Sequence, residues 1–190
     1  MIRLKESITV QRSLTEVFNY TSDFSRIEAW DPGVRSSCRR HPGKTGVGSK
    51  YDLVLKFGPF RPEMTYEIME YDPFSRVVLA GTGGSFTAVD TIEFSETAAG
   101  TRIDYQADLS FHRLGRGAEQ MLSPVMEKIG KTAMAGLEQK LSGRQGGGLK
   151  PKRFQSGSGL IDYIADHLIF PGMLMFSAFG YDLSRRFWVE

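Results

Sequence analysis

Asp90 is the residue whose type and position most clearly suggest chemistry. It lies in phase with four apolar residues of one predicted strand: Phe86, Ala88, Ile92 and Phe94. Burial of an unpaired carboxylate is unfavourable and raises its pKa, which suits a general acid or base or a ligand anchor. The pattern also fits a strand bulge that turns Asp90 outward, or a structural pair with an arginine. From the sequence these structural roles are favoured.

The histidines do not form a metal-binding motif. His41, His112 and His167 are scattered, and none has a cysteine or glutamate at ligand spacing. Asp162 and Asp166 are one helical turn apart with His167 adjacent, which could hold a metal, but a solvated helix face is the more common arrangement. We therefore expect no metal.

The glycine clusters do not form a nucleotide-binding motif. Gly43-Lys44-Thr45 resembles the end of a phosphate-binding loop, but the required glycine five positions earlier is Cys38. Residues 81–84 are glycine-rich and join two predicted strands, so they are interpreted as a turn. The sequence gives no reason to expect a cofactor.

Hydrophobic periodicity predicts strands around one long helix. Ser13 and Glu16 form a capping box before a short helix that buries Val17 and Phe18, and Asp23 caps a second short helix. A long helix is expected from about residue 117 to 141, with apolar residues at helical spacing. Strands are expected over residues 2–11, 34–41, 51–57, 64–68, 77–80, 86–94 and 103–111.

The composition is that of an ordinary globular protein. The 190 residues include 24 basic and 22 acidic side chains, so the net charge of +2 gives little support to nucleic-acid binding. One cysteine cannot form an internal disulfide, which favours a reducing compartment. Glu6 lies where a signal peptide would need its apolar stretch, and a cytoplasmic location is expected.

The last part of the chain differs from the rest. Residues 143–159 are rich in glycine and basic side chains, as in a flexible linker. Residues 160–190 form an amphipathic and then wholly apolar extension, flanked by basic residues. This extension could dock on its own domain, form a homodimer or contact a membrane peripherally through residues 160–188. Self-docking or dimerisation is favoured.

Residues 1–142 are expected to form one domain, and motifs along about residues 3–142 resemble one known family. They include Trp30-Asp31-Pro32, Gly46-Val47-Gly48-Ser49, Tyr71-Asp72-Pro73 and Gly100-Thr101-Arg102. The chain resembles the polyketide cyclase/dehydrase and lipid-transport family of the START-like, Bet v 1-like (SRPBCC) superfamily. The resemblance implies an α+β helix-grip fold, with a curved antiparallel sheet of about seven strands wrapped on the long C-terminal helix.

The resemblance also implies an apolar internal cavity. The aromatic residues then have a use, as walls for a flat or lipid-like guest. The alternative is a filled core, but the resemblance favours the cavity. Residues expected to line it are Trp30, Tyr51, Leu53, Tyr66, Ile68, Leu79, Phe86, Ala88, Asp90, Ile92, Tyr105, Leu109, Leu122 and Met126.

Three functions are compatible with this interpretation. The first is binding or transport of a small hydrophobic ligand such as a lipid, a quinone or a polyketide-like molecule. The second is a cyclase or dehydratase that uses Asp90, Tyr66 and Tyr105 as acid or base. The third is an interaction module that acts through the C-terminal extension.

Overall fold

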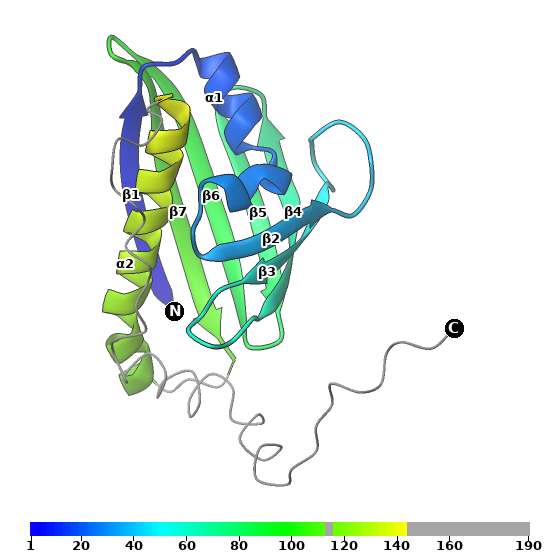
Figure 1. The fold of residues 1–190 in the computed structure, drawn as a ribbon, viewed down its shortest axis with the longest axis vertical. Coiled ribbons are helices and arrows are strands. Elements are labelled where there is room, and N and C mark those ends of the chain that lie inside the picture. Colours follow the sequence, from blue (N-terminus) through cyan, green and yellow to red (C-terminus); the bar gives the residue numbers. More distant parts are fainter. Residues whose placement is uncertain (113–115, 144–190) are drawn as a thin grey trace, which may run out of the picture.

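Seven antiparallel strands form one sheet in the order β1-β7-β6-β5-β4-β3-β2 (Figure 1). The computed structural model describes residues 1–112 and 116–143. Two α-helices and a 3-10 helix complete the fold. The elements are β1 Ile2–Val10, α1 Leu14–Thr21, η1 Phe24–Ala29, β2 Val34–Arg39, β3 Lys50–Leu55, β4 Glu63–Asp72, β5 Arg76–Gly83, β6 Phe86–Thr97, β7 Gly100–Phe111 and α2 Arg116–Leu141.

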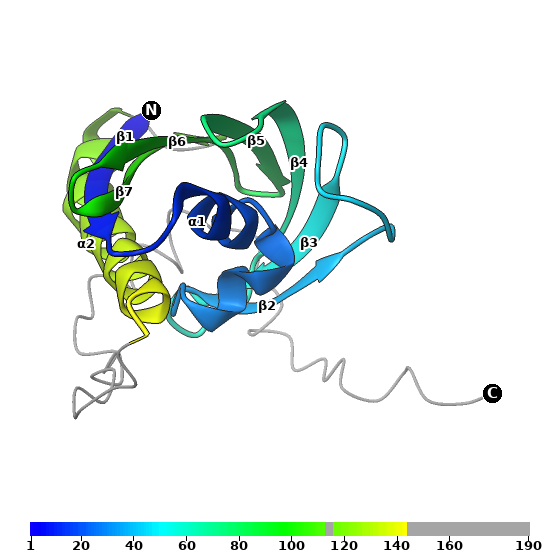
Figure 2. The same cartoon turned by 90° about the horizontal axis from the view of Figure 1, so that it is seen from above.

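The sheet is curved, and the helices lie on its concave side. Figure 2 shows the strands bending around α1 and η1, while α2 runs along the side formed by β1 and β7. Apolar residues from all these elements form one core. This arrangement confirms the predicted helix-grip fold.

Local sequence explains where the short helices begin. The Ser13 hydroxyl accepts a hydrogen bond from the Glu16 backbone N–H at 3.4 Å, and the Asp23 carboxylate accepts one from Ser25 N–H at 3.2 Å. Both oxygens satisfy N–H groups that a helix start leaves free. The two predicted caps are therefore confirmed.

A close contact positions α2 against the segment that follows η1. Gly136 of α2 faces Trp30, and a Cβ atom at this glycine would overlap the carbonyl oxygen of Trp30. The absence of a side chain therefore sets how closely α2 approaches the concave face.

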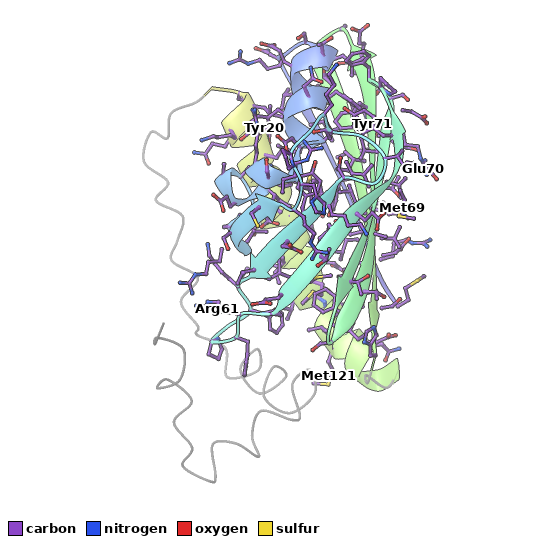
Figure 3. The ribbon with its side chains drawn as sticks, turned by 90° about the vertical axis from the view of Figure 1, so that its right-hand side faces the viewer. Tyr20, Arg61, Met69, Glu70, Tyr71 and Met121 are labelled. Atoms are coloured by element: carbon purple, nitrogen blue, oxygen red, sulfur yellow. The ribbon has the colours of Figure 1, made fainter. Side chains whose placement is uncertain are left out.

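A bulge between Ile68 and Glu70 interrupts the alternation of β4. Met69 and Glu70 are both exposed at the outside of the sheet, as Figure 3 shows. The next inward side chain is Tyr71, whose ring lies 5.2 Å from that of Phe18. Because bulges bend a strand, this one contributes to the curvature of the sheet.

Two segments differ from the prediction. The turn predicted at residues 81–84 was wrong, because β5 continues through Gly83 and pairs with β4 and β6. β3 ends at Leu55, so Phe57 lies outside the strand in which it was expected.

Residues 144–190 lie outside the described residues, and they contain nearly all of the predicted linker and the whole predicted extension. In the part of the chain that the structure describes, no helix is long and apolar enough to cross a membrane.

Candidate functional site

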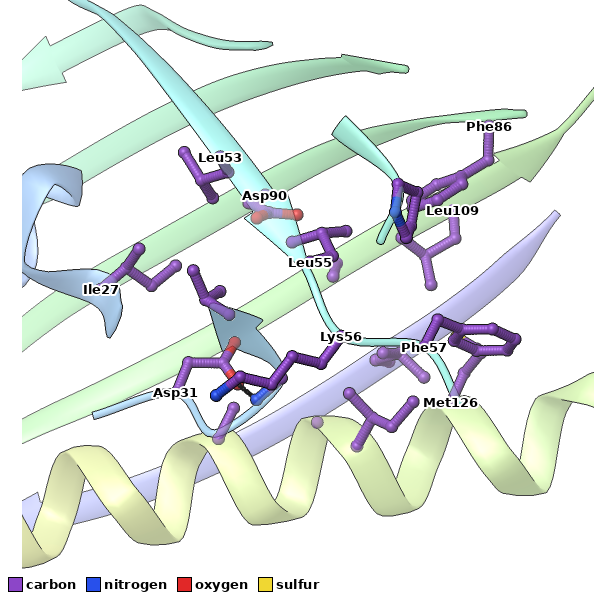
Figure 4. Close-up of a pocket in the computed structure, with 18 of the residues that line it drawn as sticks. Ile27, Asp31, Leu53, Leu55, Lys56, Phe57, Phe86, Asp90, Leu109 and Met126 are labelled. Carbon is purple, nitrogen blue, oxygen red and sulfur yellow. Dashed lines mark hydrogen bonds between the residues drawn. The ribbon is translucent and has the colours of Figure 1, made fainter. Parts of the chain in front are cut away.

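A pocket of about 140 Å³ lies between the concave face of the sheet and α2 (Figure 4). Most of its wall is apolar. On α2 the wall is formed by Met126, Ile129, Gly130 and Ala133, which helical spacing places on one face. The sheet contributes residues from β1, β2, β3, β4, β6 and β7.

The residues predicted for the cavity divide into two groups. One group lines the pocket: Leu53, Tyr66, Phe86, Asp90, Tyr105, Leu109 and Met126. The other group is buried in the packed core: Trp30, Tyr51, Ile68, Leu79, Ala88, Ile92 and Leu122. Phe24 of η1 helps to fill the space near the second group, with its ring 6.1 Å from that of Tyr51.

Asp90 lies near the middle of β6, between Leu79 of β5 and Ala107 of β7. The register is continuous through these pairs, so the bulge considered from the sequence is not found. Asp90 lines the pocket and is only 3% exposed. Among the described residues, no arginine pairs with it, and its Oδ1 atom has no hydrogen-bond partner. The carboxyl group therefore faces the interior.

Two tyrosines lie near Asp90: Tyr105 on the adjacent strand β7, and Tyr66 on β4, on the far side of β5. Tyr66 of β4 pairs with Gly81 of β5, and a Cβ atom at Gly81 would lie 2.7 Å from Tyr66 Cζ. The glycine thus leaves room for the tyrosine ring to lie across β5. Tyr105 is two residues from Ala107, the strand partner of Asp90, and so is a diagonal neighbour on the same face. Both hydroxyls lie close enough to the Asp90 carboxyl group for a hydrogen-bonding interaction with it.

The surroundings of Asp90 bring its proton equilibrium close to neutrality. Burial raises the pKa of Asp90 to about 7, while the hydrogen bonds from Tyr105 and Tyr66 act to lower it. The negative charge of Asp31 raises this pKa further. Burial, and secondly the charge of Asp90, raise the pKa of both tyrosines well above the ordinary value. The tyrosines therefore remain protonated donors where Asp90 titrates.

Asp31 is a second carboxyl group in the pocket, and the sequence did not single it out. It follows η1 and accepts a hydrogen bond from the Gly33 backbone N–H at 2.7 Å. Burial raises the pKa of Asp31 to about 6, opposed by the bond from Gly33 and by the charge of Lys56. Lys56 extends across the pocket towards Asp31 (Figure 4). Locally, Asp31-Pro32-Gly33 is typical only of a helix end.

The polar groups of the pocket can exchange a proton or hold the polar end of an apolar molecule. In the described ranges, no group of three or more His, Cys, Asp and Glu side chains is placed to hold a metal ion. The cluster of Asp162, Asp166 and His167 considered from the sequence lies outside those ranges.

Solved structures that share this fold have low sequence identity to the chain. The chain is similar to a protein from Thermus thermophilus, with a TM-score of 0.64 at 15% identity over 73% of this chain and 96% of that one. It is similar to the Zhui aromatase/cyclase from a Streptomyces species, with a TM-score of 0.61 at 13% identity over 73% and 92%. A START superfamily protein from Mycobacterium smegmatis gives a TM-score of 0.58 at 13% identity over 75% and 95%. These likenesses show the fold.

The sequence itself matches one family model. No curated protein sequence matches the chain. The model for polyketide cyclase / dehydrase and lipid transport, however, matches residues 1–142, which span the whole sheet and α2. The chain therefore belongs to the polyketide cyclase / dehydrase and lipid transport family.

Proposed function

We propose that the protein binds a small hydrophobic molecule, of the lipid, quinone or polyketide type, in the pocket between the sheet and α2. The observation that carries this proposal is a cavity of about 140 Å³ whose apolar wall surrounds a few convergent polar groups. This combination is typical of small-molecule sites.

The volume limits what the pocket can enclose. An apolar cavity of about 150 Å³ holds a benzene-sized guest. One ring therefore fits inside, and a second ring or the rest of a long chain extends past Lys56, which is exposed at the edge of the pocket. Leu53, Leu109 and Met126 would contact the apolar part of the ligand.

Ligand titrations of the full chain test the proposal. We would use 1,4-naphthoquinone, 2-naphthol and decanoate as probes, with thermal shift and methyl NMR as readouts. Ala133→Leu introduces a larger side chain from α2 into the pocket and should weaken binding about tenfold or more. Val89→Leu is the matched control, because Val89 is 44% exposed on the other face of β6. Absence of binding by all three probes, or unchanged affinity in Ala133→Leu, would contradict the proposal.

Acid–base catalysis is a second candidate, favoured by the position of Asp90. A general acid or base works best with a pKa near the operating pH, and the pKa of Asp90 is raised to about 7. When Asp90 is protonated, its own O–H could donate a hydrogen bond to a substrate carbonyl. One solved structure of similar fold is an aromatase/cyclase, which supports testing cyclisation or dehydration.

A catalytic role of Asp90 can be distinguished from a role in binding alone by the effect of its substitution on the reaction rate. With a linear poly-β-ketone analogue as substrate, Asp90→Asn should lower the rate of cyclisation or dehydration by roughly 100-fold or more. The affinity for 2-naphthol should change much less. An unchanged rate in Asp90→Asn would exclude this role.

A further inference from the structure

The polar side chains that line the pocket are mostly hydrogen-bond acceptors. Asp90 and Asp31 contribute carboxylate oxygens. The hydroxyl groups of Tyr66 and Tyr105 interact with Asp90 through hydrogen bonding, and their oxygens have lone pairs that can accept hydrogen bonds from a ligand. Among the described residues that line the pocket, Lys56 is the one cationic side chain, and it lies at the exposed edge.

Asp90 keeps unused acceptor capacity in a buried position. Its side chain is only 3% exposed, and Oδ1 has no partner in the described part of the chain. An ionised carboxylate accepts several hydrogen bonds, and a buried one that lacks them is unfavourable. A hydrogen-bond donor on a ligand would pair with this free oxygen of Asp90.

The two carboxyl groups also leave the pocket short of positive charge. Asp31 and Asp90 act on each other electrostatically, since the charge of Asp31 raises the pKa of Asp90. Lys56 offsets the charge of Asp31, whereas no basic residue is among the groups that act on Asp90. A ligand with a positive charge would therefore be stabilised beside Asp90, and an anion would be repelled.

We infer that the ligand carries a protonated amine on an apolar body, with the ammonium group beside Asp90 between Tyr66 and Tyr105. This inference rests on the proposed function, because it specifies the class of hydrophobic molecule that the same pocket binds. The ammonium supplies the missing donor, and the oxygens of the two tyrosines can accept its remaining protons.

Three one-ring probes of similar size test the charge preference. They are 2-phenylethylamine, 2-phenylethanol and 3-phenylpropionate, titrated calorimetrically into the full chain at pH 8. Both the amine and the alcohol can donate a hydrogen bond to Asp90, but only the amine adds a positive charge beside the ionised carboxylate, which should favour the amine by about tenfold. The carboxylate should bind most weakly. An alcohol or a carboxylate that binds as tightly as the amine would overturn the inference.

The preference should depend on pH in a defined direction. The amine stays protonated from pH 6 to pH 8, whereas Asp90 ionises around pH 7. The affinity of the protein for the amine should therefore be about tenfold higher at pH 8 than at pH 6. Titratable groups that act on Asp90 are Tyr66 of β4, Tyr105 and Asp108 of β7, and Asp31 after η1. Affinity for 2-phenylethanol should not rise over this range. An amine affinity that falls or stays constant would contradict the inference.

Asp90→Asn tests whether Asp90 causes the preference for the amine. The variant should bind 2-phenylethylamine and 2-phenylethanol about equally, whereas Asp104→Asn, a change on β7 at a partly exposed ion pair with Arg102, should keep the preference. If Asp90→Asn does not fold, the ratio of amine affinity to alcohol affinity in the wild type, and the pH dependence of this ratio, still test the inference. Binding of neutral probes without an amine preference contradicts this inference alone. Failure of every probe contradicts the proposed function as well.

Discussion

Replacing Asp90 with asparagine should remove a large part of the pH dependence of stability between pH 5 and pH 8. Asp90 has a pKa of about 7 in the folded protein, against an ordinary value of 3.8, chiefly because it is buried. The folded state therefore holds the proton more tightly than the unfolded state. The resulting stability is fully present below about pH 4 and is lost as the pH rises through 7.

The size of the effect follows from the two pKa values. A difference of about 3 in pKa corresponds to about 4 kcal/mol of unfolding free energy. About 3 of these 4 kcal/mol should disappear between pH 5 and pH 8. The whole pKa difference can be converted into unfolding free energy because Asp90 is only 3% exposed, so solvent screens its charge little. Asparagine does not ionise, and the variant should gain stability relative to the wild type by this amount over the same interval.

Urea unfolding at several pH values measures the difference directly. The free energy of unfolding of Asp90→Asn minus that of the wild type should increase by about 3 kcal/mol from pH 5 to pH 8. Asp52→Asn is the control, because Arg40 and Thr65 lower the pKa of Asp52 and its contribution changes only in more acidic solution. Curves for Asp90→Asn and the wild type that run parallel from pH 5 to pH 8 would refute the reasoning.

Glycine substitutions give two further predictions, each with a control glycine. Gly81→Ala should displace the Tyr66 ring and lower the unfolding free energy by about 1–3 kcal/mol through overpacking, measured by urea unfolding and by NMR of the ring protons. Gly84→Ala should be nearly neutral, because a Cβ atom there meets nothing within 4 Å. Gly136→Ala should also destabilise by about 1–3 kcal/mol despite the better helix propensity of alanine. In Gly130→Ala the new Cβ atom would lie 3.4 Å from the nearest side chain, and thermal unfolding should show no loss of stability.

The helices and strands could be predicted because their determinants are local, whereas their helix-grip arrangement was implied by the family resemblance. Alternation over residues 103–111 identifies the buried face of β7, and the helical stripe through Met126 identifies the face of α2 that meets the sheet. The capping residues Ser13 and Asp23 mark where the short helices begin. These patterns depend on neighbours a few positions apart, so they remain visible in one sequence.

The site could be predicted only in part, because it depends on packing between distant segments. Asp90 was placed on the correct face by its phase, but the energetic argument against burying a carboxylate favoured an outward bulge or a structural pair with an arginine. Asp31 and Lys56 enter the pocket from segments whose local patterns indicate a helix end and an exposed strand residue. Gly81 resembles a turn residue, whereas in the structure it makes room for the ring of Tyr66 from the paired strand β4.

The burial of Asp90 is easier to explain by ligand binding than by folding. Its strand neighbours Leu79 and Ala107 are apolar and buried, so an apolar residue at position 90 would continue the same face. The carboxyl group instead lowers stability by about 4 kcal/mol once it ionises, a large fraction of a typical folding free energy of about 5–15 kcal/mol. Local conflicts of this size tend to occur at functional sites. Asp90 lies on the wall of the pocket, and the hydrogen-bonding interaction of Tyr66 and Tyr105 acts on it. We therefore take these three residues as the polar centre of the binding site we propose.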